Sequence, residues 1–161
     1  MRPVLARSAG VSVALALGAT VVPAYAAQPV VVAVDGTLCD LTKTLAAGAA
    51  SVTCLIPPGG DPHSYSLKPS DRSQIGKSDL VLHIGFGLTP SAKKLKSPGT
   101  VVAVGEVALP SYGGSDPHVW HDPANSAAMV RVISSSLAPV LPASDRAALQ
   151  QRTARAVAVL Q

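Results

Sequence analysis

The sequence predicts an α/β protein whose parallel sheet is built from right-handed βαβ units. Three observations predict this class. Short β-branched runs alternate with segments of helical periodicity. Gly, Pro and Ser clusters separate these segments. The 135 residues left when 26 of the 161 are set aside as an export signal are enough for one domain with its own core.

The first two strands bracket a helix. Residues 29–34 form a continuous β-branched run, which is typical of a strand buried on both faces. Residues 37–47 have helical periodicity, and Gly48 follows as a stop signal. A second strand is predicted over residues 51–56, because a Pro-Pro-Gly-Gly turn interrupts the chain directly after it.

Two more strands are predicted in the middle of the chain. Ser70 can cap a short helix that runs through Lys77. A third strand follows over residues 79–84, then a helix or helical turn over 89–96, and a fourth strand over 100–104.

The last third of the chain is predicted to be helical. After a loop over residues 108–115, Asp122 is the expected cap of a helix over 123–137, with Pro123 in its first turn. A final helix is predicted from Ala143, because its apolar residues recur at helical spacing.

The first 26 residues have the three-part pattern of a secretory signal peptide. Arg2 and Arg7 give a basic start, residues 9–22 are apolar, and an Ala-Tyr-Ala cleavage site ends at Ala26. An uncleaved membrane anchor is the alternative, but the apolar run is shorter than the roughly 20 residues that a spanning helix needs. We therefore expect cleavage after Ala26, a periplasmic mature protein and no stable membrane insertion.

Charge and composition argue against a nucleic-acid partner. Without Arg2 and Arg7, the 13 basic residues fall to 11 against nine acidic ones, and aromatic residues are few. The densest basic group, Lys93, Lys94 and Lys96, is interpreted as a solvated helix face.

The only two cysteines of the chain are Cys39 and Cys54. In an oxidising compartment an even count favours a disulfide between them. Two buried reduced thiols remain the alternative. Metal ligation is less favoured, because the pair lies away from both histidine motifs described next.

The most informative feature is a repeated Asp-Pro-His-x-aromatic motif, at residues 61–65 and 116–120. Proline stiffens each turn, and neutral imidazole is the commonest protein ligand for transition metals. His63 follows the second predicted strand and His118 the fourth, so both project from the carboxyl edge of the sheet, where α/β proteins bind ligands. We expect them to share a metal ion. Two unrelated turns with exposed histidines are the alternative.

Roles for the neighbouring residues stay open at this stage. Asp61 and Asp116 either orient the imidazoles or cap their turns, and the aromatic residues of the two motifs can shield the site from water. His121 is interpreted as an exposed or supporting residue, because the helix begins only after it. His83, inside an apolar strand, is expected to be packed with a hydrogen-bond partner.

These motifs resemble a known family, the zinc/manganese substrate-binding proteins of ABC transporters, with the zinc branch favoured. Residues 57–71 are similar to the first metal-ligand loop of that family, 78–85 to the strand that follows, and 116–125 to the second ligand loop, where leucine usually stands in place of His121. The resemblance implies two lobes joined by a long helix. It also implies that His63 and His118 are the ligands of the first lobe.

The resemblance further implies how the chain is organised and what it does. We expect a metal-binding lobe over residues 27–142 and the start of the linking helix over 143–161, with a third histidine and a carboxylate expected beyond Gln161. The implied function is capture of zinc, or alternatively manganese, and delivery to a membrane permease without catalysis. The loop at 109–115 lacks the histidines that the zinc branch often carries.

Two other functions fit the sequence less well. A zinc hydrolase would need His121 as a third ligand and a nearby general base, and the mature chain has only one glutamate, Glu106. Catalytic motifs such as G-x-S-x-G, the P-loop and H-E-x-x-H are absent from the sequence. A truncated fragment without function is the remaining alternative.

Overall fold

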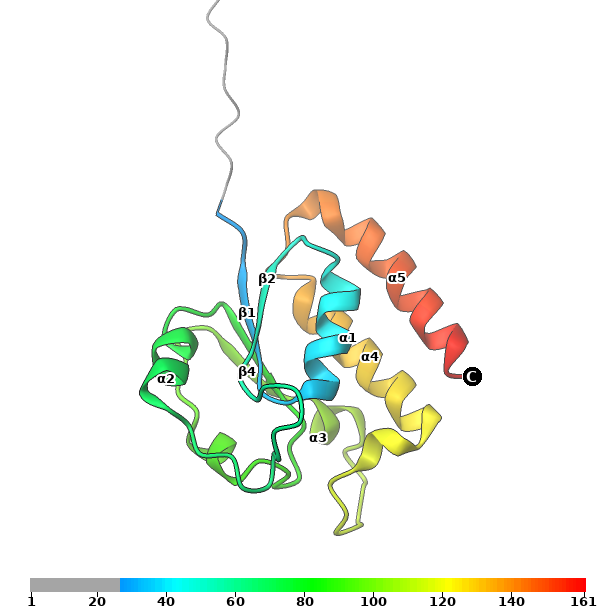
Figure 1. Ribbon diagram of the computed structural model, residues 1–161. Helices are drawn as coiled ribbons and strands as arrows, with labels where there is room; N and C mark the ends of the chain where they lie inside the picture. Colours follow the sequence, from blue (N-terminus) through cyan, green and yellow to red (C-terminus); the bar gives the residue numbers. More distant parts are fainter. Residues whose placement is uncertain (1–26) are drawn as a thin grey trace, which may run out of the picture.

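A parallel four-stranded sheet of order β2-β1-β3-β4 forms the centre of the computed structural model, which describes residues 27–161 (Figure 1). Every strand pair in it is parallel, so the predicted α/β class is confirmed. The predicted signal peptide, residues 1–26, lies outside the described residues. The strands are β1 (Val30–Ala33), β2 (Ser51–Cys54), β3 (Leu80–His83) and β4 (Thr100–Ala103).

The main hydrophobic core lies between one face of the sheet and a helical layer. This layer consists of α1 (Gly36–Ala46), α3 (Val104–Ala108), α4 (Pro123–Leu137) and α5 (Arg146–Val159). Figure 1 shows α1, α4 and α5 side by side on this face, and α4 contacts each of the other three helices. The core includes the fully buried residues Val31, Leu38, Leu45, Leu82, Met129 and Ile133.

The opposite face of the sheet has a thinner cover, made of α2 (Pro69–Ile75) and loops. Val32 and Val81 pack there against Ile75 in a second, smaller core. Val31 and Val32 point to opposite faces and are both completely buried, as predicted for a strand covered on both sides. Among residues 27–161, no helix is long and apolar enough to span a bilayer.

Helix α1 is held at both ends. The Asp35 carboxylate accepts a hydrogen bond from the Leu38 backbone N–H (3.1 Å), which caps the first turn. At the other end, Arg152 of α5 donates through Nε to the Leu45 carbonyl (2.6 Å) and so satisfies a terminal acceptor while joining the two helices. Asp122 caps α4 through the Ala124 N–H, as predicted.

One prediction of local structure was wrong, and one short helix was missed. Ser70 does not cap α2. Lys68 is the capping residue, and its backbone N–H donates to Asp71 (2.8 Å). The helix or helical turn predicted over residues 89–96 is present as a 3₁₀ helix, Pro90–Lys94. The sequence pattern also missed α3 because its five residues are too short to show helical periodicity.

The last predicted helix begins differently as well. Ala143–Asp145 forms a 3₁₀ turn, and α5 starts only at Arg146. Helix α5 packs against α1 and α4. Its interpretation as the start of a linking helix stays a prediction.

Asp35→Asn is expected to stabilise the protein above pH 6. Burial raises the pKa of Asp35 from 3.8 to about 6, although backbone N–H groups partly oppose this. The folded state therefore binds this proton more tightly than the unfolded state, so stability falls as the pH rises from about 4 to 6. Asparagine does not ionise, so it removes this pH-dependent loss of stability, and its side-chain oxygen still caps the helix. We expect a gain of about 1–2 kcal/mol at pH 8 and almost none near pH 4.

Urea unfolding between pH 4 and 8 measures this difference. Asp40→Asn, on the exposed face of the same helix, is the matched control. An equal change in the free energy of unfolding at pH 4 and pH 8 in Asp35→Asn would contradict the raised pKa of Asp35.

Candidate metal centre

The loop after β2 presents His63 from a fixed turn. Asp61 accepts a hydrogen bond from the His63 backbone N–H (2.9 Å) and another from the Ser64 hydroxyl (2.9 Å). These bonds lower the pKa of Asp61, the His63 N–H contributing most. Asp61 therefore caps the turn, and no bond to the imidazole ring is found among the described residues.

The loop before α4 holds His118 through both its backbone and its ring. Asp116 Oδ1 accepts from the His118 backbone N–H (2.9 Å) and lies 2.6 Å from His118 Nδ1. Both contacts lower the pKa of Asp116, the backbone bond first. An ionised carboxylate can only accept, so Nδ1 of His118 carries the proton. Its Nε2 is then left with a free lone pair, which is the form that binds a metal.

The two imidazoles meet at the carboxyl edge of the sheet. His63 Nε2 lies 3.0 Å from His118 Nε2, and the ring centroids are 4.9 Å apart. Since His118 Nε2 accepts, His63 Nε2 donates in the metal-free protein. Zinc bonds of about 2.0–2.1 Å in a tetrahedral array place two nitrogens about 3.4 Å apart, so a shift of a few tenths of an ångström would let one ion replace the shared proton.

The aromatic residues of the two motifs behave differently. The Trp120 ring meets the His118 ring edge-on at a centroid distance of 5.2 Å and covers one side of it. Tyr65 turns away from the site. Its hydroxyl lies 2.8 Å from Asp71 Oδ2 and 3.0 Å from the Leu55 carbonyl oxygen. Burial, and then Asp71, raise the pKa of Tyr65 to about 12, so it remains a donor. The expected shielding role is therefore not found for Tyr65.

The other two histidines do not join the pair. His121 ends a 3₁₀ turn (Val119–His121), is exposed, and has its ring centroid 6.3 Å from that of His118. His83 is half-buried at the end of β3, and burial lowers its pKa while Glu106 opposes this. No hydrogen bond to the His83 ring is found in residues 27–161, which differs from the expected partner.

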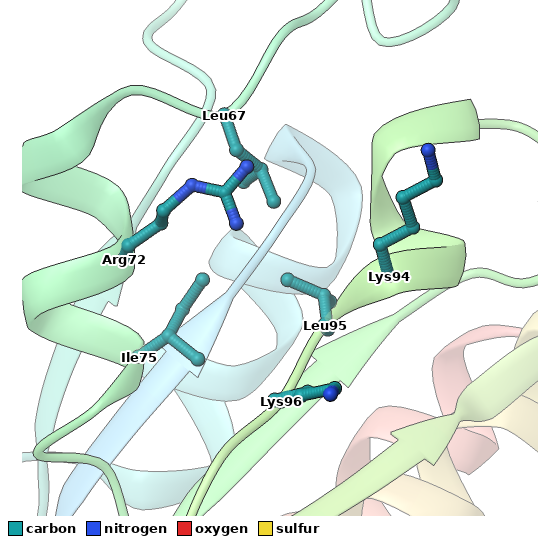
Figure 2. A pocket seen from close by; sticks show the side chains of 6 residues that line it. All are labelled: Leu67, Arg72, Ile75, Lys94, Leu95 and Lys96. Carbon is teal, nitrogen blue, oxygen red and sulfur yellow. The ribbon is translucent and has the colours of Figure 1, made fainter.

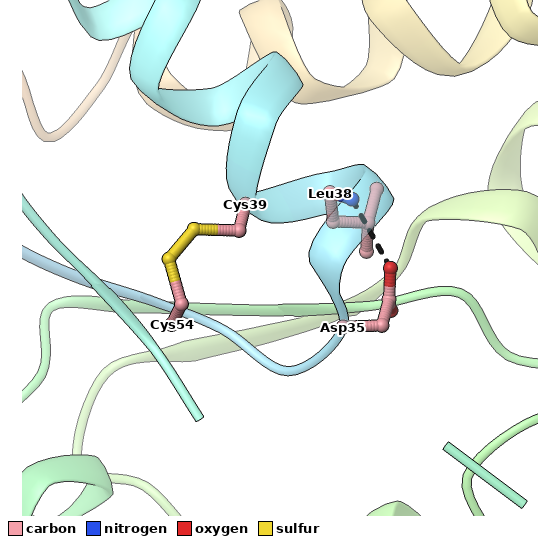
Figure 3. The surroundings of a disulfide bond; sticks show 4 residues. All are labelled: Asp35, Leu38, Cys39 and Cys54. Atoms are coloured by element: carbon pink, nitrogen blue, oxygen red, sulfur yellow. Dashed lines mark hydrogen bonds between the residues drawn. A yellow bond between two sulfur atoms is a disulfide. The ribbon is translucent and has the colours of Figure 1, made fainter. Parts of the chain in front are cut away.

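Within the described part of the chain, no group of three or more His, Cys, Asp or Glu side chains is placed to hold a metal. The site thus offers two imidazoles. Cys39 and Cys54 are joined as a disulfide between α1 and the end of β2, with their Cα atoms 5.5 Å apart (Figure 3). The sulfur atoms are therefore not ligands here.

A hollow of about 310 Å³ lies on the second face of the sheet, beside α2 (Figure 2). Arg72 of α2 and the exposed Lys94 and Lys96 line it together with the apolar side chains of Ile75 and Leu95. The three positive charges would repel a divalent cation. This hollow is not a candidate for the metal site.

Sequence reasoning missed two residues that support the second loop. Tyr112 donates from its hydroxyl to the Asp116 carbonyl (2.9 Å), and Glu106 accepts from the Phe86 N–H (2.6 Å). The only available signal was an aromatic residue in an otherwise Gly/Pro/Ser-rich loop, which does not reveal a contact.

Comparison with known proteins decides the family. The model of the family described as "Zinc-uptake complex component A periplasmic" matches residues 31–161. The chain belongs to this zinc-uptake family. The two histidine loops and the four-stranded sheet, except for Val30 at the start of β1, lie within the matched residues.

The similar proteins share both sequence and fold with the chain. The zinc-binding protein TroA of Treponema pallidum is 33% identical over 129 residues, 74% of this chain and 42% of that protein. The manganese-binding lipoprotein MntA of Halalkalibacterium halodurans is 34% identical over 105 residues, 61% of this chain and 35% of that protein. The chain thus spans about two fifths of these relatives' length.

The solved structures agree on the fold. The periplasmic zinc-binding protein TroA of T. pallidum superposes with a TM-score of 0.76 at 29% identity, covering 83% of this chain and 52% of that one. The Zn(II)-bound ZnuA-like domain of Streptococcus pneumoniae AdcA gives a TM-score of 0.73 at 23% identity, covering 84% and 52%. The similar proteins named here are described as metal-binding, in agreement with the prediction that the chain is not an enzyme.

Proposed function

We propose that this chain captures a divalent transition metal outside the cytoplasm and passes it to an ABC permease. The observation that carries the proposal is the 3.0 Å approach of His63 Nε2 and His118 Nε2 at the ligand-binding edge of the sheet. The Asp116 carboxylate fixes one of these imidazoles in its metal-binding form. Membership of the zinc-uptake family and the zinc- and manganese-binding relatives support the same function.

Zinc is the preferred metal in this proposal and manganese the alternative. Imidazole nitrogen suits zinc, whereas manganese prefers oxygen ligands and lies at the weak end of the affinity series. The described residues offer two imidazoles, and the carboxylates of both motifs, Asp61 and Asp116, accept backbone N–H groups of their own turns, so the site favours zinc. Export is part of the proposal, with the signal peptide removed after Ala26. N-terminal sequencing of the secreted chain should then begin at Ala27.

The 161-residue chain is expected to bind zinc only weakly. Tetrahedral zinc needs four ligands, and the described residues provide two, so water or groups outside this chain must supply the others. We expect a Kd of about 1 µM or weaker, which corresponds to a binding free energy of about −8 kcal/mol or less favourable. Calorimetric titration of the monomer with zinc measures it.

Manganese should bind more weakly than zinc in the same titration. A nanomolar zinc affinity in the monomer would contradict this two-ligand account, because it would require further protein ligands.

A further inference from the structure

The short segment 109–115, between α3 and the second histidine loop, is closed by one side chain. The Tyr112 backbone N–H donates to the Leu109 carbonyl (3.0 Å), which makes a turn. The Tyr112 hydroxyl then donates across the segment to the Asp116 carbonyl (2.9 Å). A Cβ atom on Gly114 would overlap the phenol group, so the backbone approaches this side chain closely.

The Tyr112 ring is in turn anchored on the body of the protein. It packs against Phe86, with ring centroids 5.0 Å apart, and both residues contact the main core. Phe86 has a φ of 50°, in the left-handed region that is unfavourable for a residue with a side chain. The Glu106 carboxylate holds it there by accepting from its backbone N–H (2.6 Å). The contacts therefore run from α3 through Phe86 and Tyr112 to Asp116.

This series of contacts ends at Asp116. Its carbonyl is held by Tyr112, and its carboxylate is 2.6 Å from His118 Nδ1. The carboxylate that orients the His118 ring also accepts the His118 backbone N–H (2.9 Å), so its position depends on the backbone of this turn. Asp116 is largely exposed, with 72% of its side chain accessible, so burial does not restrain it.

We propose that Tyr112 is a positioning residue for metal capture. Its hydroxyl holds the Asp116 backbone so that the Asp116 carboxylate keeps the proton on His118 Nδ1 and the lone pair on Nε2. Glu106 supports it by fixing Phe86 beneath the tyrosine ring. This inference rests on the proposed function, since it requires His118 to be a metal ligand.

Tyr112→Phe tests the proposal because it removes the hydroxyl and keeps the ring on Phe86. Long-range ¹H–¹⁵N NMR of the metal-free full chain reports the tautomer of each histidine. We expect a single Nδ1–H form of His118 in the wild type and a tautomer mixture in the variant. Zinc affinity should fall about threefold to tenfold, less than the 10–100-fold typical of residues bonded directly to a metal ligand.

Tyr65→Phe is the matched control. It also deletes a tyrosine hydroxyl with two close partners, so it should lower stability but leave the His118 tautomer unchanged. Gly114→Ala, which displaces the phenol group without touching it chemically, should reproduce the effect of Tyr112→Phe on the tautomer.

The outcomes separate this inference from the proposed function. An unchanged His118 tautomer in Tyr112→Phe, with zinc binding still dependent on His118, would overturn the positioning role alone. Zinc binding that survives His118→Ala would overturn the metal site itself. A tautomer shift of equal size in Tyr65→Phe would reduce the effect to lost stability and would also overturn the inference.

Discussion

Replacing His118 with alanine is expected to lower zinc affinity by about a hundredfold or more. The change removes one of the two imidazoles and leaves His63 alone, which cannot hold the ion against water. It also deprives Asp116 of its ring partner without disturbing the buried core, since His118 is 36% exposed. Competition against a chromophoric chelator at constant pH measures the loss. His63→Ala should give a loss of similar size.

His121→Ala is the control for this experiment. It removes an exposed imidazole three positions away, on the same segment and with the same change in size. Zinc affinity should remain within about twofold of the wild type. If His121→Ala lowered zinc affinity as much as His118→Ala, His121 would be a third histidine ligand. Three protein ligands with one position open to water would then favour the zinc hydrolase alternative.

Removing the Cys39–Cys54 pair is expected to lower the free energy of unfolding by about 3 kcal/mol. The bond spans 15 positions of sequence and ties α1 to the end of β2, the strand at the edge of the sheet. Closing such a loop restricts the unfolded chain. The double variant Cys39→Ala/Cys54→Ala avoids a lone thiol, and urea unfolding with and without reductant measures the difference.

The reductant provides an internal control. It should shift the unfolding midpoint of the wild type and leave the double variant unchanged. Alkylation of two free thiols in native, non-reduced protein would instead show that the cysteines are unpaired. The first histidine loop begins just after β2, so loss of the bond should also weaken zinc binding modestly.

The sheet and the histidine pair were predictable because they depend on patterns that the chain repeats. The buried run at residues 29–34 marks a central strand, and strands alternating with helices impose a parallel sheet. A parallel sheet brings every strand's carboxyl end to one edge, so loops 55 positions apart meet there. The contact between His63 and His118 follows from topology.

The contacts that hold the two histidine loops in place were not predictable in the same way. Asp61 and Asp116 stand at identical positions in the two motifs, yet only Asp116 bonds its imidazole. Part of the difference is local, because the Ser64 hydroxyl donates to Asp61 and Val119 stands at the equivalent position of the second motif. Tyr112 holds the Asp116 backbone from a loop whose closure depends on Phe86, and that contact crosses from one element to another. The local sequence does not predict contacts between separate elements.

Local capping was equally hard to predict. Ser70 is a favourable capping residue, but Pro69 occupies the first helical position and moves the cap back to Lys68. Asp71 can then bond both Lys68 and the half-buried Tyr65, an arrangement that depends on the fold around it.

X-ray absorption at the zinc edge of the zinc-loaded chain tests the central claim most directly. Two imidazole nitrogens at about 2.0–2.1 Å are expected in the wild type, with water completing the shell, and one imidazole in His118→Ala. A spectrum without imidazole scattering, or one that is identical in the wild type, His63→Ala and His118→Ala, would contradict the claim that this pair of histidines binds the metal.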